Sequence, residues 1–481
     1  MPGRRRAARD VYSHDVIVIG AGAAGLTAAG GCAMFGLRVA LVERGVMGGE
    51  CLNAGCVPSK ALIAAARRAA AMRDGERFGV RAGEVRVDWA GVRAHVAAAV
   101  ARIAPRDGRE RFEALGVEVV AGEARLLDAK RVRVGERVLR APRIVIATGS
   151  RPHVPALPGI ETVPVLTNDT VWELDVLPQH LVVMGGGSIG VELAQAFRRL
   201  GAAVTVVEHG RCLAREDPDA AALVLDALRR DGVRIREAAE VVRVGRGEGG
   251  DGIVIELAGG EQLAASHLLV AGGRDARVEH LDLEAAGVAS GTNGIRVDRR
   301  RRTGNRRVFA VGDCREGPRF THLAGEDGSV VVRNIALGWP ARIDLSTLPR
   351  VLFADPELAQ LGMTAAEARA AGGRVSVETR GFDGDDRAAT EGREEGFVRV
   401  VRRGRRIAGV TIVGENAGEM LLPWSLVMRK RASTFVLADT VVAYPTRSER
   451  SKAAAFGMHE GLVFGRAARG WAALLARVRR R

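Results

Sequence analysis

The segment GGECLNAGCVPSK, residues 48–60, contains two of the chain's five cysteines, Cys51 and Cys56. A zinc site would need two further ligands, and the sequence has no second cysteine pair or histidine pair at the usual short spacing. A disulfide across so short a loop would stabilise the fold by roughly 2 kcal/mol in the chain-entropy model, about half the value for a 100-residue loop. The spacing therefore favours a redox-active pair. The isolated cysteines are expected to be plain buried thiols: Cys32, Cys212 and Cys314.

Two glycine-rich segments repeat one another and would position these thiols. The first, DVIVIGAGAAGLTAAGGCAMFGLRVALVE, begins as an apolar strand, passes through three glycines and an alanine-rich helix, and ends in a second strand. Residues 181–208 follow the same order. A shift of 165 positions, without a gap, superposes Gly20, Gly22, Gly25, Gly36, Val39, Val42 and Glu43 on Gly185, Gly187, Gly190, Gly201, Val204, Val207 and Glu208.

This pattern is typical of a dinucleotide site. The first glycine makes a tight turn, the second lets the backbone approach a pyrophosphate, and the third lets the helix pack on the strand. The pyrophosphate then lies at a helix N-terminus, where free N–H groups favour anions. Glu43 and Glu208 each follow the third glycine by 18 positions, about where a carboxylate would accept hydrogen bonds from a ribose 2'-OH.

Two dinucleotide sites in one chain indicate a flavin and a nicotinamide cofactor that work together. The thiol pair directly follows the first copy, so the cofactor held there should exchange electrons with sulfur. A flavin can accept a hydride from a nicotinamide and pass two electrons to a disulfide. We therefore expect FAD at the first copy and NAD(P)H at the second.

GGECLNAGCVPSK resembles the active-site signature of the class I pyridine nucleotide-disulfide oxidoreductases, the family of dihydrolipoamide dehydrogenase, glutathione reductase and mercuric reductase. The resemblance extends from Asp15 to about Gly457. Further family-like pieces follow in order: IVIATGS (144–150), LLVAGGR (268–274), RVFAVGD (307–313), THLAGEDGSVVVRN (321–334) and VLFADPELAQLGMT (351–364). It implies an α/β fold of two Rossmann-like domains, for FAD and NAD(P), with a C-terminal α/β dimerisation domain.

The resemblance also assigns roles to residues. Cys56 would lie against the flavin as the charge-transfer thiolate, and Cys51 would be the interchange thiol that meets the substrate. Lys60 would approach flavin N5 and pair with Glu192, and Asp313 would hydrogen-bond the ribityl chain. The expected cofactor-binding residues are Gly20, Gly22, Gly25, Glu43, Gly49, Lys60, Thr148, Gly149, Gly312 and Asp313 for FAD, and Gly185, Gly187, Gly190, Glu208 and Gly273 for the nicotinamide cofactor.

The chain departs from the family's pattern at its general base. Members that act on dithiols usually carry a histidine, then Pro-Thr, with a glutamate five residues after the histidine. Here the stretch VVAYPTRSERSK places Tyr444 at that position and keeps Glu449. A tyrosine titrates at about 10, so at neutral pH it donates a hydrogen bond and is a poor base. His459 is a weaker candidate for the missing base, and a packed interface tyrosine is the structural alternative.

In having a tyrosine at this position, the chain resembles mercuric reductases. It lacks their C-terminal cysteine pair, since Cys314 is its last cysteine. The sequence thus favours a mercuric reductase-like active site with an unidentified small-molecule acceptor. Dihydrolipoamide dehydrogenase is the alternative enzyme. A flavin-bound redox sensor, or a membrane-associated electron-transfer partner, is the alternative that is not an enzyme in the ordinary sense.

The nicotinamide is expected to be NADH. Glu208 favours a 2'-OH and repels a 2'-phosphate. His209, Arg211 and Arg215 follow closely and would instead help to bind NADPH. The prediction therefore depends on which of these groups faces the ribose.

Composition excludes several classes of protein. Apolar residues make up 47% and charged residues 27%, which is typical of a globular chain. The net charge of +15 does not indicate nucleic-acid binding, because aromatics are only 4% and the arginines are scattered. The run from Arg299 to Arg302 is expected to be a solvated loop. Residues 16–42 contain glycines and Arg38, which argue against a membrane span, and no secretory signal precedes them, so we expect a cytoplasmic protein.

A chain of 481 residues is expected to form several domains. We predict an FAD domain from residues 1–155 and 275–345, a nicotinamide domain from 156–274, and an interface domain from 346–460. A homodimer follows if Tyr444 and Glu449 complete the partner's site. Residues 461–481 have the apolar and arginine spacing of a basic amphipathic helix, which would pack on its own protein or contact a membrane surface peripherally.

Overall fold

The computed structural model describes residues 12–247, 252–404 and 406–480, which form two compact units. Within those residues, the first unit comprises Met1–Gly185, Leu200–Ala202 and Val242–Asp344. The second comprises Gly186–Arg199, Ala203–Val241 and Leu345–Arg481. Residues 1–11 of the predicted FAD domain and Arg481 of the tail lie outside the described residues.

A parallel five-stranded sheet organises the first unit. Its strands, in spatial order, are β20 (Val308–Ala310), β7 (Arg143–Ile146), β1 (Val16–Ile19), β2 (Val39–Glu43) and β3 (Val117–Ala121). All neighbouring strands are parallel. Parallel strands are buried on both faces, which explains why these strands are almost continuously apolar. Each parallel strand also ends at the same edge of the sheet as its neighbours.

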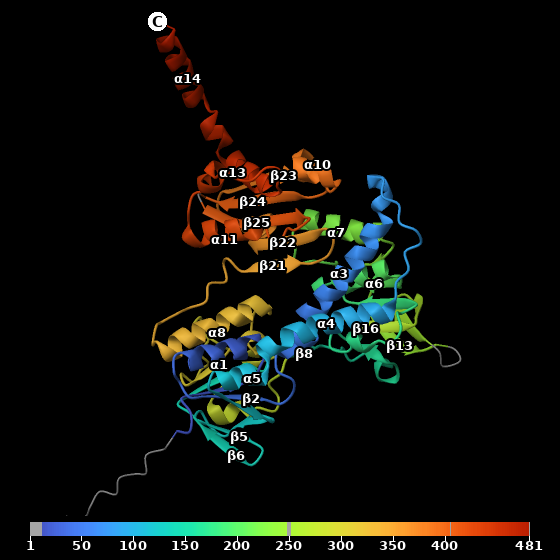
Figure 1. The fold of residues 1–481 in the computed structure, drawn as a ribbon, viewed down its shortest axis with the longest axis vertical. Coiled ribbons are helices and arrows are strands. Elements are labelled where there is room, and N and C mark those ends of the chain that lie inside the picture. Colours follow the sequence, from blue (N-terminus) through green and yellow to red (C-terminus); the bar gives the residue numbers. More distant parts are fainter. Residues whose placement is uncertain (1–11, 248–251, 405, 481) are drawn as a thin grey trace, which may run out of the picture. The chain divides into compact units, whose positions relative to one another are not determined.

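Alternate residues of the central strand enter two separate cores. Val16 and Val18 pack on one face with helices α1 (Ala23–Met34) and α8 (Thr321–Ala336), whereas Ile17 and Ile19 face the other core. The two helices pack closely (Figure 1). Gly328 permits this approach, because a Cβ there would lie 2.7 Å from the carbonyl oxygen of Ala24.

The opposite face is covered by a small antiparallel sheet. Its strands are β4 (Ala124–Leu126), β5 (Arg131–Val134) and β6 (Arg137–Arg140). The apolar stretch 16–42 thus forms β1, α1 and β2, as predicted from its glycines and Arg38. Among the described residues, no helix has both the length and the apolar content needed to cross a bilayer.

The remaining elements of the first unit carry the motifs or support them. The helices are α2 (Gly49–Asn53), α3 (Cys56–Arg73), α4 (Trp89–Asp107) and α5 (Arg109–Ala114). The strands are the antiparallel pair β8 (Ser150–Pro152) and β17 (Arg274–Ala276), and the parallel set β10 (His180–Met184), β16 (His267–Val270) and β9 (Val165–Leu166). A further sheet contains β13 (Val241–Arg246), β14 (Ile253–Leu257) and β15 (Gln262–Ala265).

An antiparallel sheet forms the centre of the second unit. Its order is β21 (Pro349–Leu352), β22 (Glu357–Gly362), β25 (Arg406–Gly414), β24 (Phe397–Arg403) and β23 (Val375–Gly381). Helices α11 (Leu421–Lys430) and α13 (Ser448–Val463) pack on it around the fully buried Trp424, whose Nε1–H donates to Ser451 Oγ at 3.1 Å.

The second unit also holds the helix and strand that follow the second glycine loop. These are α6 (Ser188–Leu200) and β11 (Ala203–Val207), with β12 (Arg234–Arg236) parallel to β11 and α7 (Pro218–Arg230) between them in sequence. The chain therefore reads strand, glycine loop, helix and strand twice, as the sequence repeat predicts.

Candidate active site

The first glycine loop has the geometry that a dinucleotide site requires. Gly20 has a φ of +102°, and a Cβ at this residue would overlap the carbonyl oxygen of Ala147. A Cβ at Gly25 would overlap the carbonyl oxygen of Gly20. Gly22 is the N-cap of α1, and no side chain caps the free N–H groups of the first turn. These groups fit a pyrophosphate, which accepts hydrogen bonds from a helix N-terminus.

Glu43 ends β2 and faces the glycine loop. Its Oε2 accepts a hydrogen bond from Ala21 N at 2.7 Å, and its Oε1 accepts one from Gly45 N at 2.8 Å. The same bonds recur 165 positions later: Glu208 accepts from Gly186 N at 2.7 Å and from Gly210 N at 2.9 Å. The sequence repeat is therefore accompanied by the same hydrogen-bond pattern in both copies.

The second glycine loop is open at its middle glycine. Gly185 has a φ of +118°, and a Cβ there would lie 2.6 Å from the carbonyl oxygen of Ala271. Gly190 is buried in α6. Gly187 differs, since a Cβ there would meet no described atom within 4 Å in this structure. His209 Nδ1 lies 2.8 Å from Glu208 Oε1, so a predicted helper of NADPH binding contacts the carboxylate itself.

In the first copy, the thiol segment covers the middle glycine. A Cβ at Gly49 would lie 2.6 Å from Gly22 Cα, so only glycine permits this approach. Gly49 is also the first residue of α2 and has a φ of +62°. The two cysteines follow at once, Cys51 within α2 and Cys56 at the first residue of α3. The segment that carries the thiol pair therefore packs directly against the glycine loop.

Cys51 and Cys56 are both thiols in this structure, and their side chains hydrogen-bond one another. The pKa of Cys51 is raised, first by its hydrogen bond with Cys56, then by burial and by the charge of Cys56. Thr321 Oγ1, at the start of α8, lies 3.4 Å from Cys56 Sγ and also hydrogen-bonds Cys51. Cys56 sits at the positive end of the 18-residue helix α3, which favours a thiolate on its sulfur.

Lys60 lies one helical turn after Cys56 and therefore shares its face of α3. Its Nζ donates to Ser59 Oγ at 3.4 Å. Glu192 belongs to α6 in the second unit, where its Oε1 accepts a hydrogen bond from Phe353 N at 2.9 Å. Lys60 belongs to the first unit, and its pairing with Glu192 stays a prediction.

A polar network extends from Glu50, which stands between Gly49 and Cys51. Arg274 Nη2 donates to Glu50 Oε2, and Asn168 Nδ2 donates to Glu50 Oε1 at 2.7 Å. Arg274 Nε also donates to Ser150 Oγ at 2.8 Å. The Ser150 hydroxyl in turn donates to Asp313 Oδ2 at 2.9 Å. The network thus links the helix of the interchange thiol to the residue that the resemblance assigns to the ribityl chain.

Burial raises the pKa of Glu50 to about 7. The charge of Arg274 opposes this shift, whereas the charges of Asp169 and Asp313 add to it. Sequence reasoning missed Glu50 as a member of this network. Glu50 and Arg274 both stand inside quoted motifs, but only the folded chain shows that they meet.

A buried ion triad contacts Gly312, the neighbour of the predicted flavin aspartate Asp313. Asp327 is fully buried, and its Oδ2 accepts from Gly312 N at 3.1 Å. Arg301 Nε donates to Asp327 Oδ1 at 2.5 Å, and Arg315 Nε donates to Oδ2 at 2.6 Å. The expectation of a solvated loop from Arg299 to Arg302 is therefore wrong for Arg301, which is only 5% exposed. Its charge is stabilised by a carboxylate that lies far away in sequence.

The other predicted FAD and nicotinamide residues lie near the β8–β17 pair. Thr148 Oγ1 donates to the carbonyl oxygen of Arg277 at 2.6 Å, and Gly149 accepts from Arg277 N at 3.0 Å. Gly149 and Gly273 both have positive φ, +70° and +139°. These contacts position the turns, and the roles of the residues in cofactor binding stay predictions.

Tyr444 is exposed, and its OH donates to Asp386 Oδ2 at 2.8 Å within the second unit. This hydrogen bond raises the pKa of the phenol, which makes Tyr444 a still weaker base at neutral pH. Glu449 lies in the first turn of α13. His459 bonds Thr434 Oγ1 at 2.7 Å, and burial lowers its pKa.

The three isolated cysteines are buried, as predicted. Burial raises the pKa of Cys32 and Cys212 to about 12 and that of Cys314 to about 11. In the described part of the chain, no group of three or more His, Cys, Asp or Glu side chains could hold a metal ion.

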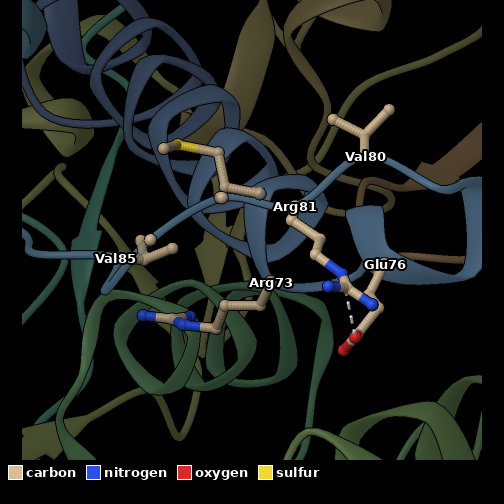
Figure 2. A pocket seen from close by; sticks show the side chains of 8 residues that line it. Arg73, Glu76, Val80, Arg81 and Val85 are labelled. Atoms are coloured by element: carbon tan, nitrogen blue, oxygen red, sulfur yellow. Dashed lines mark ion pairs between the residues drawn. The ribbon is translucent and has the colours of Figure 1, made fainter.

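A cavity of about 310 Å³ lies at the far end of α3 and is not the thiol site. Figure 2 shows its lining, which includes Arg73, Val80 and the ion pair of Arg81 with Glu76 at 3.6 Å. Arg73 is 17 residues beyond Cys56, about 25 Å along the helix. The cavity therefore has no part in the chemistry of the sulfur atoms.

Comparison with known proteins identifies the family. A family model described as pyridine nucleotide-disulphide oxidoreductase matches residues 14–328, and the model of the corresponding dimerisation domain matches residues 348–455. The chain belongs to the pyridine nucleotide-disulphide oxidoreductases. The recognised family, the α/β fold class with its C-terminal dimerisation domain, and the assignment as an enzyme are thereby confirmed.

Relatives in this family cover almost the whole chain. Mercuric reductase of Streptomyces lividans is 33% identical over 454 residues, which span 92% of this chain and 95% of that protein. Dihydrolipoyl dehydrogenase 3 of Pseudomonas aeruginosa is 37% identical over 463 residues, which span 93% and 98%.

Solved structures of the family are similar in fold. The Cu(II) complex of the HOCl-induced flavoprotein disulfide reductase RclA from Escherichia coli has a TM-score of 0.82 at 29% identity, covering 91% of this chain and 99% of that one. LpdA from Mycobacterium tuberculosis has a TM-score of 0.85 at 27% identity, covering 92% and 99%. The family uses FAD and NAD(P)H, and the uncapped α1 terminus with its glycine loop fits the FAD pyrophosphate.

Proposed function

We propose that this oxidoreductase uses NAD(P)H, with NADH favoured, to reduce a Cys51–Cys56 disulfide and then an external acceptor. The observation that carries the proposal is the contact of Gly49 with Gly22, which places the thiol pair directly beside the first glycine loop. FAD bound at that loop would supply the ring that accepts a hydride and returns two electrons to sulfur. In balance, NADH and the disulfide give NAD⁺, one thiol on Cys51 and one thiolate on Cys56.

The two sulfur atoms have different roles in this proposal. Cys56 holds negative charge at the N-terminus of α3, beside Thr321 Oγ1. The raised pKa of Cys51 keeps its proton on sulfur until an acceptor approaches. Cys51 then gives its proton to water and forms the bond to the acceptor. Cys56 attacks Cys51 Sγ, so that the bond between Cys51 and the acceptor breaks, its electron pair leaves with the reduced product and the disulfide closes. Lys60 and Glu192 would orient the ring that passes the electrons.

The acceptor that we favour is a thiophilic metal ion. Thiolates are preferred ligands of soft metals. Two kinds of relative have metals in their names, mercuric reductase and the Cu(II) complex of RclA. Tyr444 is hydrogen-bonded to Asp386 and is a poor base, which disfavours a dithiol substrate because a dithiol needs deprotonation.

Dihydrolipoyl dehydrogenase is the second candidate, because the Pseudomonas aeruginosa relative of that name is 37% identical. A redox sensor without turnover is not favoured, since the family consists of enzymes.

We further propose a cytoplasmic homodimer in which Tyr444 and Glu449 complete the partner's site. Both residues lie within the matched dimerisation domain, residues 348–455. Residues 1–155 and 275–345 would bind FAD, and 156–274 would bind the nicotinamide. Peripheral contact with a membrane through the tail is a separate prediction that does not depend on this reaction.

Anaerobic titration with NADH, followed by visible absorbance, tests the assignment of the two thiols. The wild-type protein should develop a long-wavelength charge-transfer band on two-electron reduction. Cys56→Ser should lose the band, whereas Cys51→Ser should show it without reduction, because Cys56 then remains a thiolate beside the oxidised ring. Cys212→Ser is the matched control and should behave as wild type. A Cys56→Ser protein that keeps the band would contradict the assignment.

A screen of acceptors separates the candidate functions. With NADH as reductant, the acceptors Hg(II), Cu(II), lipoamide, glutathione disulfide and a quinone would be compared on the purified wild-type protein, and dihydrolipoamide would be tested in the reverse direction with NAD⁺ as oxidant. Turnover of about 10 per second is taken as ordinary enzyme activity. Tyr444→His should gain dihydrolipoamide turnover, since an imidazole titrates at about 6.5. Rapid wild-type turnover of dihydrolipoamide would instead establish the second candidate.

A further inference from the structure

Helix α14 (Arg466–Arg479) has no part in the core of the second unit. No residue of the helix is buried, and Figure 1 shows it extending away from α13 and from the sheet of the same unit. The helix also lies beyond the matched dimerisation domain, which ends at residue 455. The expectation that the tail packs on its own protein is therefore not met among the residues that the structure describes.

The helix has two chemically different faces. Trp471, Leu474 and Val478 recur at helical spacing on one side and are 61%, 50% and 62% exposed. Leu462 and Phe464, just before the helix, add exposed apolar surface at 79% and 53%. Exposed large side chains gathered in one stripe mark an interaction surface, whereas single ones are ordinary.

The opposite face is basic. At 3.6 residues per turn, four arginines fall on the side away from the tryptophan: Arg466, Arg469, Arg477 and Arg480. Residues 461–481 contain no aspartate or glutamate. Over the described residues 461–480, these arginines form no ion pair, and so their charge is available to an anionic partner.

An anionic lipid surface would satisfy both faces at once. We propose that α14, with Leu462 and Phe464, docks on a bilayer that contains acidic lipids. Its apolar side chains would enter the boundary of the acyl chains, while the arginines would reach the phosphate headgroups. Tryptophan is a side chain typical of this interface.

Other partners fit the surface less well. A nucleic acid would neutralise the arginines but leave Trp471, Leu474 and Val478 in water. A second α14 would cover the apolar stripe but, since residues 461–481 contain no Asp or Glu, would leave the arginines without an anionic partner. The helix lies on the membrane and does not cross it, because its 14 residues extend about 21 Å, whereas the hydrocarbon core is about 30 Å thick.

Vesicle flotation with the full-length, FAD-loaded protein tests the proposal. We expect the protein to float with phosphatidylcholine vesicles that contain phosphatidylglycerol, and not with phosphatidylcholine alone, and we expect salt to weaken binding. Trp471→Ala should lower the affinity about tenfold. The double variant Arg469→Gln and Arg477→Gln should lower it about 25-fold, since each arginine contributes a factor of about five.

The matched control is Trp339→Ala. Trp339 is also 61% exposed but lies in the first unit, and its replacement should leave vesicle binding unchanged. Visible absorbance of the bound flavin and the circular dichroism spectrum report that each variant is folded.

Four outcomes would overturn the proposal. The protein fails to float with acidic vesicles, or it floats equally well with neutral ones. Alternatively, Trp471→Ala changes the oligomeric mass and not the vesicle binding, which would indicate packing between copies. Finally, the tail arginines are needed for binding to a nucleic acid and not to vesicles. None of these results bears on the thiol chemistry, which the NADH titration tests by itself.

Discussion

The two glycine loops have the same pattern of hydrogen bonds from backbone N–H groups to a glutamate side chain, and they differ in what lies over the middle glycine. In both, a glutamate at the end of the second strand accepts from two backbone N–H groups around the loop. Gly49 lies against Gly22 in the first copy, whereas Gly187 in the second copy has open space beside it. The first glycine loop thus packs against the segment that carries the thiols, whereas the middle of the second loop is open to a ligand.

Their surroundings differ in charge as well. The strands and helix of the first copy lie in a unit whose polar centre includes Asp327 with two buried arginines, and Glu50 with Arg274. Beside the second loop, His209 is 86% exposed and contacts Glu208. A buried charge must be matched within the protein, whereas an exposed charge is free to meet a ligand. This difference suggests a tightly held cofactor at the first loop and an exchangeable one at the second.

The largest effect on stability is expected at the buried ion triad of Asp327, Arg301 and Arg315 in the first unit. Asp327→Asn leaves Arg301 and Arg315 without their shared carboxylate, which should lower the free energy of unfolding by about 3–5 kcal/mol. Asp219→Asn in the second unit removes one of the two carboxylates that pair with Arg399, the other being Asp217, and Asp219 is 69% exposed, so it should cost less than about 1 kcal/mol. Urea unfolding of both variants makes the comparison, and equal losses would show that the buried triad is not special.

The next effect separates the covered loop from the open one. Gly49→Ala places a methyl group 2.6 Å from Gly22 Cα at a positive φ, and it should destabilise the protein by about 2 kcal/mol or more and weaken retention of the flavin. Gly187→Ala meets no described atom within 4 Å and should leave the melting temperature unchanged while raising KM for NADH. Thermal unfolding and steady-state kinetics test the pair. A Gly49→Ala protein that keeps wild-type stability would refute the close contact.

A pH effect sharpens the difference further. The pKa of Glu50, about 7 when folded, exceeds its ordinary value of 4.5. The unfolded chain therefore loses this proton first as pH rises, so stability should fall between about pH 4.5 and 7 and level off above that. The loss due to Glu50 should be roughly 1–3 kcal/mol. Urea unfolding at pH 5 and pH 8 should show it in wild type and not in Glu50→Gln. An identical pH dependence in the two proteins would assign it to other groups.

The smallest effect concerns the two matched glutamates. Glu208→Gln should raise the preference for NADPH over NADH by about tenfold in kcat/KM, equivalent to about 1.4 kcal/mol, because a carboxylate that repels the 2'-phosphate is removed. Glu43→Gln, at the same place in the first copy, should leave that preference unchanged. If both variants shift it equally, the assignment of the nicotinamide to the second copy is wrong.

Much of the fold and part of the site could be predicted from short segments. Gly20 and Gly185 each have a positive φ, and the tight turn that requires it is recognisable from a few neighbouring residues. The position of Cys56 at the start of a helix is likewise recognisable from neighbouring residues. Thr321, in contrast, lies 265 positions from the sulfur it contacts, so its membership of the site was missed although it begins a family-like piece.

By itself, the sequence determined the family, the two glycine loops and the thiol pair, because each depends on backbone conformations and spacings that adjacent residues impose. Only the tertiary structure decided that Gly49 lies on Gly22, that Glu50 meets Arg274, that Arg301 is buried, and that no residue of α14 is buried. Burial and the pairing of charges depend on residues that are distant along the chain. The contributions of burial and charge pairing to stability can therefore be assessed only from the folded structure, in which those residues are in contact.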